Sequence, residues 1–332
     1  MKDLAIKTLK LLADGEFHSG EALAHTLGMS RASVWNAVRD LDAAGLDVFR
    51  VRGRGYRLAQ PLSLLDRDEI LRQLGADAAA FTLEIMDGVS STNTLVMQRA
   101  GRGAPAAILV VAAEWQEAGR GRMGRAWHAG IGGALTFSLL WRFPQGAAFL
   151  AGLSLAVGVA LMRAFETLGI EQAGLKWPND VVWSGGKLAG ILIEVQGDML
   201  GPSAAVIGIG VNVRLSQAVR DRINQPASDL ETACGRPLDR NRVLALLLRQ
   251  LRDALETFTQ AGLAPFRDDW HRYHAHQDKM VTLILPDARR EHGCARGVAE
   301  DGALLIETPA GLRRYHSGEI SLRPTTPVMR DG

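Results

Sequence analysis

The chain has 332 residues, of which 47% are hydrophobic and 22% are charged, and its formal net charge is +2 at pH 7. This length and composition exclude a disordered or fibrous protein and predict two or three globular domains with a large apolar core. The small net charge excludes a protein that binds nucleic acid over its whole surface, so any such function must belong to a local basic patch.

The cysteines and the N-terminus bear on the cellular compartment. Cys234 and Cys294 lie far apart and in no CxxC pattern, which argues against a disulfide framework and a thiolate metal site. Lys7 and Lys10 interrupt the first apolar positions, so these positions do not form the core of a signal peptide. No stretch approaches the roughly 18 consecutive apolar residues of a membrane span. We therefore expect a cytoplasmic protein with no membrane-spanning segment.

Residues 1–62 carry the pattern of a winged helix-turn-helix domain. Apolar residues at helical spacing predict a first helix that ends at Asp14-Gly15 and a second helix capped by Ser19. A third helix is predicted from about Arg31 to Ala44, with an apolar inner face and a polar outer face. Its N-terminal part would meet base edges and phosphates in the major groove. The candidate DNA-binding residues of this helix are Ser30, Arg31, Ser33, Asn36 and Arg39.

A hairpin follows the third helix and completes the expected wing. Two short strands, 48–51 and 56–58, flank Gly53-Arg54-Gly55, and the run RVRGRGYR contains four arginines. Arg52 and Arg54 are the candidate DNA contacts of this wing. The alternative is a small helical domain whose arginines only keep it soluble. Pro61 and the polar run after it predict a junction with the larger body.

Two polar segments of the body predict ligand binding. The run Ser90-Ser91-Thr92-Asn93 precedes a helix and either caps it or binds a ligand. Further on, Gly119, Gly121 and Gly124 form a GxGxxG pattern, but no helix follows them, which excludes a dinucleotide site. No acidic residue lies between Glu117 and Glu166, so the three arginines of this loop lack a local partner and favour an anionic ligand. Those arginines are Arg120, Arg122 and Arg125. A basic loop that binds nucleic acid is the alternative.

The motifs SSTN, QEAGRGRMGR, KWPND, KLAG and GIGVN occur in this order. Together they resemble the biotin-protein ligases over nearly the whole body that follows residue 62. Residues 1–62, the N-terminal head, resemble the head of the bifunctional bacterial form, which is also the repressor of the biotin operon. The resemblance implies that biotin attacks the α-phosphate of ATP, with Mg2+ on the phosphates, and that the adenylate then acylates a lysine of a carboxylase's biotin carboxyl carrier domain.

The resemblance also implies roles for single residues. Biotin would be held by Ser91, Thr92, Gln116, Gly119, Arg120, Arg122, Lys187, Gly190 and Ile191. ATP or the adenylate would contact Arg120, Arg122, Arg125, Trp127, Lys187, Asn212 and Arg323. The candidate catalytic residues are Lys187, Arg122, Asp180 and Lys176. Cations are expected there because both steps build negative charge. We expect no metal site made by the protein alone, and a solvated or capping role for His271, His274 and His276.

The expected fold is α+β in three domains. Residues 1–62 form the winged helix-turn-helix, 63–272 a class II synthetase-like core with a mixed or antiparallel sheet, and 273–332 an SH3-like β-barrel, since short alternating strands begin at Met280. The expected partners are the carrier protein and operator DNA, with a ligand-promoted homodimer. The alternatives are a lipoate ligase of the same fold and a transcription factor whose body only senses a ligand.

Overall fold

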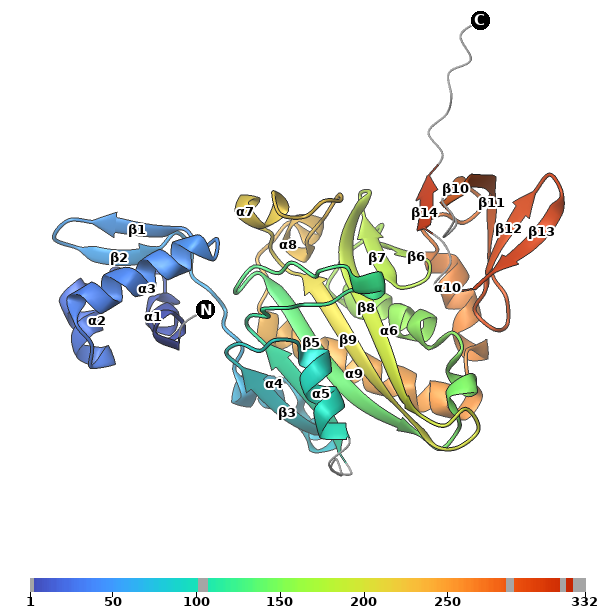
Figure 1. Cartoon of the computed structure of the whole chain (residues 1–332), viewed down its shortest axis with the longest axis horizontal. Coiled ribbons are helices and arrows are strands. Elements are labelled where there is room, and N and C mark those ends of the chain that lie inside the picture. Colours follow the sequence, from blue (N-terminus) through green and yellow to red (C-terminus); the bar gives the residue numbers. More distant parts are fainter. Residues whose placement is uncertain (1–2, 101–106, 285–289, 317–320, 325–332) are drawn as a thin grey trace, which may run out of the picture.

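The computed structural model describes residues 3–100, 107–284, 290–316 and the backbone of 321–324. Figure 1 shows three parts in chain order: an N-terminal head, a central core built on a large sheet, and a C-terminal group of strands. This arrangement confirms the expected α+β fold. None of the described helices combines the length and apolar character that crossing a membrane requires.

The head is a winged helix-turn-helix, as the sequence predicts. Ser19 and Ser30 cap its second and third helices by accepting bonds from the amides of Ala22 and Ser33. Gly28, with a φ of 63°, ends the second helix in the left-handed conformation that glycine favours. The elements are α1 (Asp3–Leu12), α2 (Gly20–Leu27), α3 (Arg31–Ala43), β1 (Val48–Val51) and β2 (Gly55–Leu58), with β1 and β2 paired antiparallel.

The core is built on a mixed sheet with the strand order β3-β4-β5-β9-β8-β7-β6. Only β3 and β4 pair in parallel among the described strands of this sheet. The strands are β3 (Phe81–Met86), β4 (Ile108–Ala113), β5 (Ala134–Phe143), β6 (Gly174–Lys176), β7 (Asp180–Trp183), β8 (Gly186–Gly197) and β9 (Ser203–Asn212). The helices are α4 (Arg67–Leu74), α5 (Thr92–Ala100), α6 (Leu153–Thr167), α7 (Gln217–Arg220), α8 (Leu230–Cys234), α9 (Arg240–Ala261) and α10 (Arg267–Tyr273).

Helices cover both faces of this sheet. Along β4, Val110 and Ala112 join the main core with α6 and α9, whereas Leu109 and Val111 join a second cluster under α5. Successive side chains of a strand point to opposite faces. The sheet is therefore buried on both sides, which explains why β4 has a continuous apolar sequence rather than an alternating one.

The C-terminal part is an antiparallel sheet with the order β13-β12-β11-β10-β14. Its strands are β10 (Met280–Ile284), β11 (Arg290–Val298), β12 (Leu304–Thr308), β13 (Gly311–Tyr315) and β14 (Ser321–Pro324). Two hydrogen bonds join this part to the core. The amide of Ala275, just before the sheet, donates to Leu175 O of the core over 2.9 Å, and Trp177 Nε1 of the core donates to Gly302 O over 3.0 Å.

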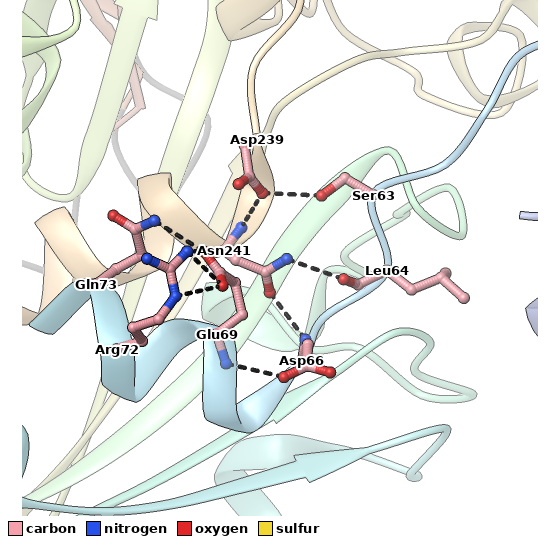
Figure 2. A network of polar contacts seen from close by, with 8 residues as sticks. All are labelled: Ser63, Leu64, Asp66, Glu69, Arg72, Gln73, Asp239 and Asn241. Atoms are coloured by element: carbon pink, nitrogen blue, oxygen red, sulfur yellow. Dashed lines mark hydrogen bonds and ion pairs between the residues drawn. The ribbon is translucent and has the colours of Figure 1, made fainter. Parts of the chain in front are cut away.

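The junction after the head is fixed to the start of α9, as Figure 2 shows. Ser63 Oγ donates to Asp239 Oδ1 over 2.9 Å, and Asp66 N donates to Asn241 Oδ1 over 2.8 Å. Asn241 Nδ2 in turn donates to Leu64 O over 3.1 Å. Residues 63–66, which we call the strap, are thus hydrogen-bonded to the core and do not form a free linker.

The head also packs on a loop of the core. Ile131 is only 3% exposed and belongs to the hydrophobic cluster of the head. Lys10 Nζ lies 2.6 Å from Asp87 Oδ1, and Arg222 Nη2 donates to Ala43 O over 3.2 Å. Because Ile131 follows Trp127 by four positions, the head contacts the end of the segment that carries the glycine and arginine motif.

Candidate active site

Strands β5, β8 and β9, the loops that follow β3 and β4, and the turn before β7 form a pocket of about 470 Å³, including its open mouth. Residues from nearly all the motifs of the sequence meet here. The lining residues are Ser91, Thr92, Asn93, Gln116, Arg120, Gly121, Arg122, Trp127, Thr136, Phe137, Asn179, Lys187, Gly190, Ile191, Leu192, Gly208, Ile209 and Gly210. One wall is uncharged and hydrogen-bonding, and another carries three cationic side chains.

The uncharged wall comes from the SSTN motif and the end of β4. Gln116 Oε1 accepts bonds from Thr92 N over 2.8 Å and from Thr92 Oγ1 over 3.2 Å. Ser138 Oγ donates to Thr92 Oγ1 over 2.7 Å. Ser91 Oγ accepts from Thr94 N over 3.4 Å, so it caps α5 while it also lines the pocket. The capping and ligand-binding interpretations of this motif are therefore compatible.

One carboxylate on β8 connects this wall to the cationic wall. Asn93 Nδ2 and Arg120 Nη2 both donate to Glu194 Oε2, over 2.8 Å and 3.0 Å. The loop arginines have no acidic partner nearby in the sequence, as expected, but β8 brings Glu194 to Arg120 from far along the chain. Sequence reasoning missed Glu194 and Asn93 as site residues, although Asn93 lies within the SSTN motif itself.

The glycine and arginine motif forms a closed hairpin over the pocket. Gly121 N donates to Arg125 O over 2.7 Å, and Trp127 N donates to Gly119 O over 2.8 Å. A Cβ at position 119 would lie 2.7 Å from the carbonyl oxygen of Trp127, so the close approach of the two backbones requires glycine. Met123, at the tip, is 75% exposed. Arg125 is exposed and lies outside the pocket wall, and Gly119 supports the hairpin rather than lining the pocket.

Lys187 is an enclosed cation of the pocket that contacts a carboxylate, and its side chain is less exposed than that of Arg120. Its Nζ lies 2.7 Å from Asp180 Oδ1 and 5.7 Å from the ring centre of Trp127. The side chains of Lys187 and Asp180 are 20% and 22% exposed. A Cβ at Gly190 would lie 2.9 Å from Lys187 Nζ, and one at Gly210 would lie 2.4 Å from Trp127 Cε2. Glycines therefore make the floor on which the lysine and the indole rest.

Arg122 adds a second enclosed cation. Its Nη1 donates to Asn179 Oδ1 over 3.1 Å. Burial lowers the pKa of this guanidinium, while nearby Asp180 opposes that shift. The group stays charged at neutral pH, and its partly desolvated charge is suited to an anionic ligand.

Three other predicted residues are placed differently. Asn212 is 3% exposed beneath the pocket, and its Nδ2 donates to Lys187 O over 3.0 Å and to Ser228 O over 3.1 Å. Lys176 lies on β6, outside the pocket wall. The backbone of Arg323 on β14 lies opposite Thr282 on β10, and the structure does not describe the side chain of Arg323.

The residues present fit a magnesium ion that arrives with a nucleotide. Among the described residues, no three His, Cys, Asp or Glu side chains group around one point. Asp180 supplies one carboxylate next to Lys187. Mg2+ typically takes one or two carboxylates together with substrate phosphates. The pocket can therefore hold a carboxylate and a polyphosphate side by side, with cations where charge would develop in an acyl-phosphate reaction.

The predicted DNA-binding residues gather on the head. Ser30 caps α3, Arg31, Asn36 and Arg39 are exposed on it, and Ser33 is half-buried. Arg52 and Arg54 are exposed in the wing, where the guanidinium of Arg54 lies 4.2 Å from the ring centre of Phe17.

Comparison with known proteins gives consistent results for all three parts. Residues 86–212 match the biotin/lipoate A/B protein ligase family, 5–57 match a helix-turn-helix domain, and 276–323 match the biotin protein ligase C-terminal domain. The chain is 41% identical to the bifunctional ligase/repressor BirA of Escherichia coli K12, over 97% of this chain and 99% of that protein. It is 32% identical to the Bacillus subtilis protein described in the same words, over 93% and 95%.

The fold also resembles solved structures. Biotin protein ligase from Aquifex aeolicus, in complex with biotin and ATP, superposes with a TM-score of 0.62 at 28% sequence identity. The match covers 74% of this chain and 99% of that one.

Proposed function

The chain belongs to the biotin/lipoate A/B protein ligase family, in its bifunctional form with a helix-turn-helix head, and from that premise we propose that it is a biotin-protein ligase and a biotin-responsive repressor. It activates biotin with ATP to biotinyl adenylate and transfers the biotin to a lysine of a biotin carboxyl carrier domain. The head binds the operator of biotin synthesis genes. One observation carries the ligase proposal: Lys187 and Arg122 line the same pocket as Thr92 and Gln116.

The uncharged wall suits the ureido ring of biotin. That ring offers a carbonyl acceptor and N–H donors, and the wall supplies the hydroxyl of Thr92 and the amide of Gln116, which are already fixed to each other. Apolar Ile191, Ile209 and Leu192 also line the pocket and suit the valeryl chain. The carboxylate end then lies toward the cations. Gly190 leaves room for Lys187 there.

The first step forms a bond between a carboxylate oxygen of biotin and the α-phosphorus of ATP, and breaks the bond from that phosphorus to pyrophosphate. Two anions must approach each other, and charge builds on the phosphate oxygens. Lys187 and Arg122 offset this repulsion from fixed positions in a partly dry site. We further propose that Mg2+, held with the help of Asp180, neutralises the leaving phosphates.

Asp180 holds Lys187 through their 2.7 Å contact. In the second step, the amine of the acceptor lysine attacks the acyl carbon of the adenylate, and AMP leaves with the bonding electrons. That amine is protonated at neutral pH, so it first gives up one proton to solvent, and a second proton leaves once the C–N bond has formed. We propose that Asp180 is the acidic group that orients the amine. Trp127, over the glycine floor, supplies a surface for the adenine, and Asn212 supports Lys187 from below through its carbonyl.

We propose that the ligand-bound protein dimerises through the free edge of β8. This strand pairs with β7 only as far as Gly190, whereas it pairs with β9 to its end at Gly197. Val195 on this stretch is 42% exposed, and Leu200 in the following turn is 93% exposed. Glu194 on the same edge contacts Arg120 of the glycine and arginine loop, so this loop is in direct contact with the edge. Sedimentation with saturating biotin and ATP tests this, and a strict monomer would refute it.

We place the protein in the cytoplasm, because operator DNA and a carboxylase carrier protein would both be met there.

A lipoate ligase is the second candidate, since the matched family includes such enzymes.

The activation step can be tested without any partner. Biotin should trigger a burst of pyrophosphate release from ATP equal to the number of active sites, and addition of a carrier domain should restart release. Pyrophosphate release that is independent of biotin, or that needs lipoate, would overturn the proposal.

A further inference from the structure

The outward face of α3 carries an exposed aromatic side chain that the DNA-binding set predicted above leaves out. Trp35 is 46% exposed and belongs to none of the hydrophobic clusters formed by the described residues. The inward face is fully accounted for by buried side chains, namely Val34, Ala37, Val38 and Leu41. The tryptophan is therefore not needed for the packing of the head.

Trp35 lies in the middle of the surface that a recognition helix presents. Ala32, Trp35, Asn36 and Arg39 are all exposed and follow each other at the spacing of one helical face. Trp35 is near the N-terminal half of α3, the part that reaches base edges in helix-turn-helix proteins. Any DNA that Asn36 and Arg39 contact must also cover the indole.

Arg39 fixes the orientation of this indole. Its guanidinium carbon lies 4.8 Å from the ring centre of Trp35. A stacked arginine restricts the rotamers of both side chains and stays available to a phosphate or a base through its outer N–H groups. The pair is thus a preformed unit with an apolar surface and a cationic rim.

The exposed cations of the head favour a polyanion as the partner of Trp35. Arg31 and Arg39 lie on α3, and Arg52 and Arg54 lie on the wing, all exposed. An exposed apolar residue amid such charges fits duplex DNA better than another protein surface, because phosphates complement the arginines. In the major groove, the apolar group that a side chain can recognise is the C5-methyl of thymine.

We infer that Trp35 is a specificity-determining residue of the operator contact, and that its indole packs against thymine methyl groups in the major groove. This inference rests on the proposed DNA-binding function. Trp35 with Arg39 reads one short A·T-containing stretch, while Arg31 and the wing arginines supply affinity that does not depend on sequence.

The test uses the full-length protein with biotin, ATP and Mg2+, and random duplex DNA from which bound sites are selected. Within the selected site, each thymine is then replaced by uracil, which removes only the methyl group. We expect one or two positions where this replacement weakens binding of the unchanged protein about tenfold, a typical cost for one altered base pair. Trp35→Ala should bind the original site about tenfold more weakly and should no longer respond to uracil at those positions.

Controls separate this role from a loss of folding. Trp35→Phe keeps an aromatic face and should keep part of the response to uracil. Leu312→Ala removes a side chain that is 61% exposed in the C-terminal sheet and should bind as the unchanged protein does. The salt dependence of binding should stay the same in Trp35→Ala, because the phosphate contacts remain.

Two results would overturn the inference. One is an unchanged protein that is insensitive to uracil at every thymine of its site, a measurement that needs no variant. The other is a Trp35→Ala protein that selects the same site and responds equally to uracil. If the unchanged protein selects no duplex at all, the DNA-binding part of the proposed function fails, and the inference fails with it.

Discussion

Arg240 and Glu114 form a buried ion pair beneath the junction between the head and the core. Arg240 Nη1 lies 2.8 Å from Glu114 Oε2, and the two side chains are 2% and 6% exposed. The same guanidinium donates to Ser63 O over 3.0 Å and to Ala134 O over 2.8 Å. Glu114 directly follows β4, and Ala134 is the first residue of β5. The ion pair therefore connects the strap to β4 and β5, the two strands between which the glycine and arginine loop lies.

Removing one charge of this pair should destabilise the protein strongly. Glu114→Gln leaves Arg240 buried without an anion, and breaking such a pair typically costs about 3–5 kcal/mol. Urea unfolding should show this loss. Asp269→Asn, which breaks the more exposed contacts of Asp269 with Arg163 and Arg272, is the control and should cost at most about 1 kcal/mol. Equal effects of the two variants would show that burial of the pair is unimportant.

Lys187→Ala should lower the rate of adenylate formation by orders of magnitude, because the variant removes a fixed cation from the point where two anions meet. Single-turnover formation of biotinyl adenylate measures this rate directly. Lys279→Ala, which removes an exposed lysine outside the pocket, should leave it unchanged. Near-normal turnover of Lys187→Ala would remove this lysine from the mechanism.

Gly210→Ala should raise the KM for ATP. The added methyl group would lie 2.4 Å from Trp127 Cε2, so the indole must leave its place on the glycine floor. A stacked adenine loses its surface when the indole moves. Gly201→Ala, whose methyl would meet nothing closer than 3.4 Å, is the matched control. A Gly210→Ala protein with an unchanged KM for ATP would show that Trp127 does not contact the nucleotide.

Two buried histidines next to the C-terminal sheet predict a loss of stability in mild acid. Burial lowers the pKa of His274 and of His276 to about 4. In the unfolded chain their pKa is about 6.5, so below that pH the unfolded state binds more protons than the folded state. The free energy of unfolding should therefore fall as the pH drops from about 6.5 toward about 4.

The slope of this dependence can be assigned by substitution. His274→Gln should remove about half of the slope, because His276 still contributes to it, whereas His25→Gln, which removes an exposed histidine, should leave it unchanged. Urea midpoints at several pH values between 4.5 and 6.5 would measure it. A stability that is constant over this window would contradict the burial argument.

Local patterns predicted much of this molecule. Ser19 and Ser30 could be recognised as caps, and the apolar spacing of the third helix predicted its bounds to within one residue of α3. The order of the motifs allowed the pocket to be anticipated, and Thr92, Gln116, Arg122 and Lys187 do lie together. These features depend on neighbours in the sequence or on a recurring motif.

Contacts set by strand order were not predictable. Glu194 lies on β8, whose neighbour β9 pairs in turn with β5, a strand from much earlier in the chain. No local pattern encodes that order, so the contact of Glu194 with Arg120 could not be predicted. The same applies to Asn212, whose amide is bonded to Lys187 O and Ser228 O under the pocket. Lys176 shares a motif with Asn179, which lines the pocket, yet Lys176 lies outside the pocket wall.

The most direct test of the central claim is the intact mass of a biotin carboxyl carrier domain after incubation with this protein, ATP and Mg2+, with biotin and with lipoate in parallel. The account predicts a mass gain equal to one biotinyl group, present with biotin and absent with lipoate. A gain only with lipoate would identify a lipoate ligase instead, and no gain with either would mean that the body senses its ligand without transferring it.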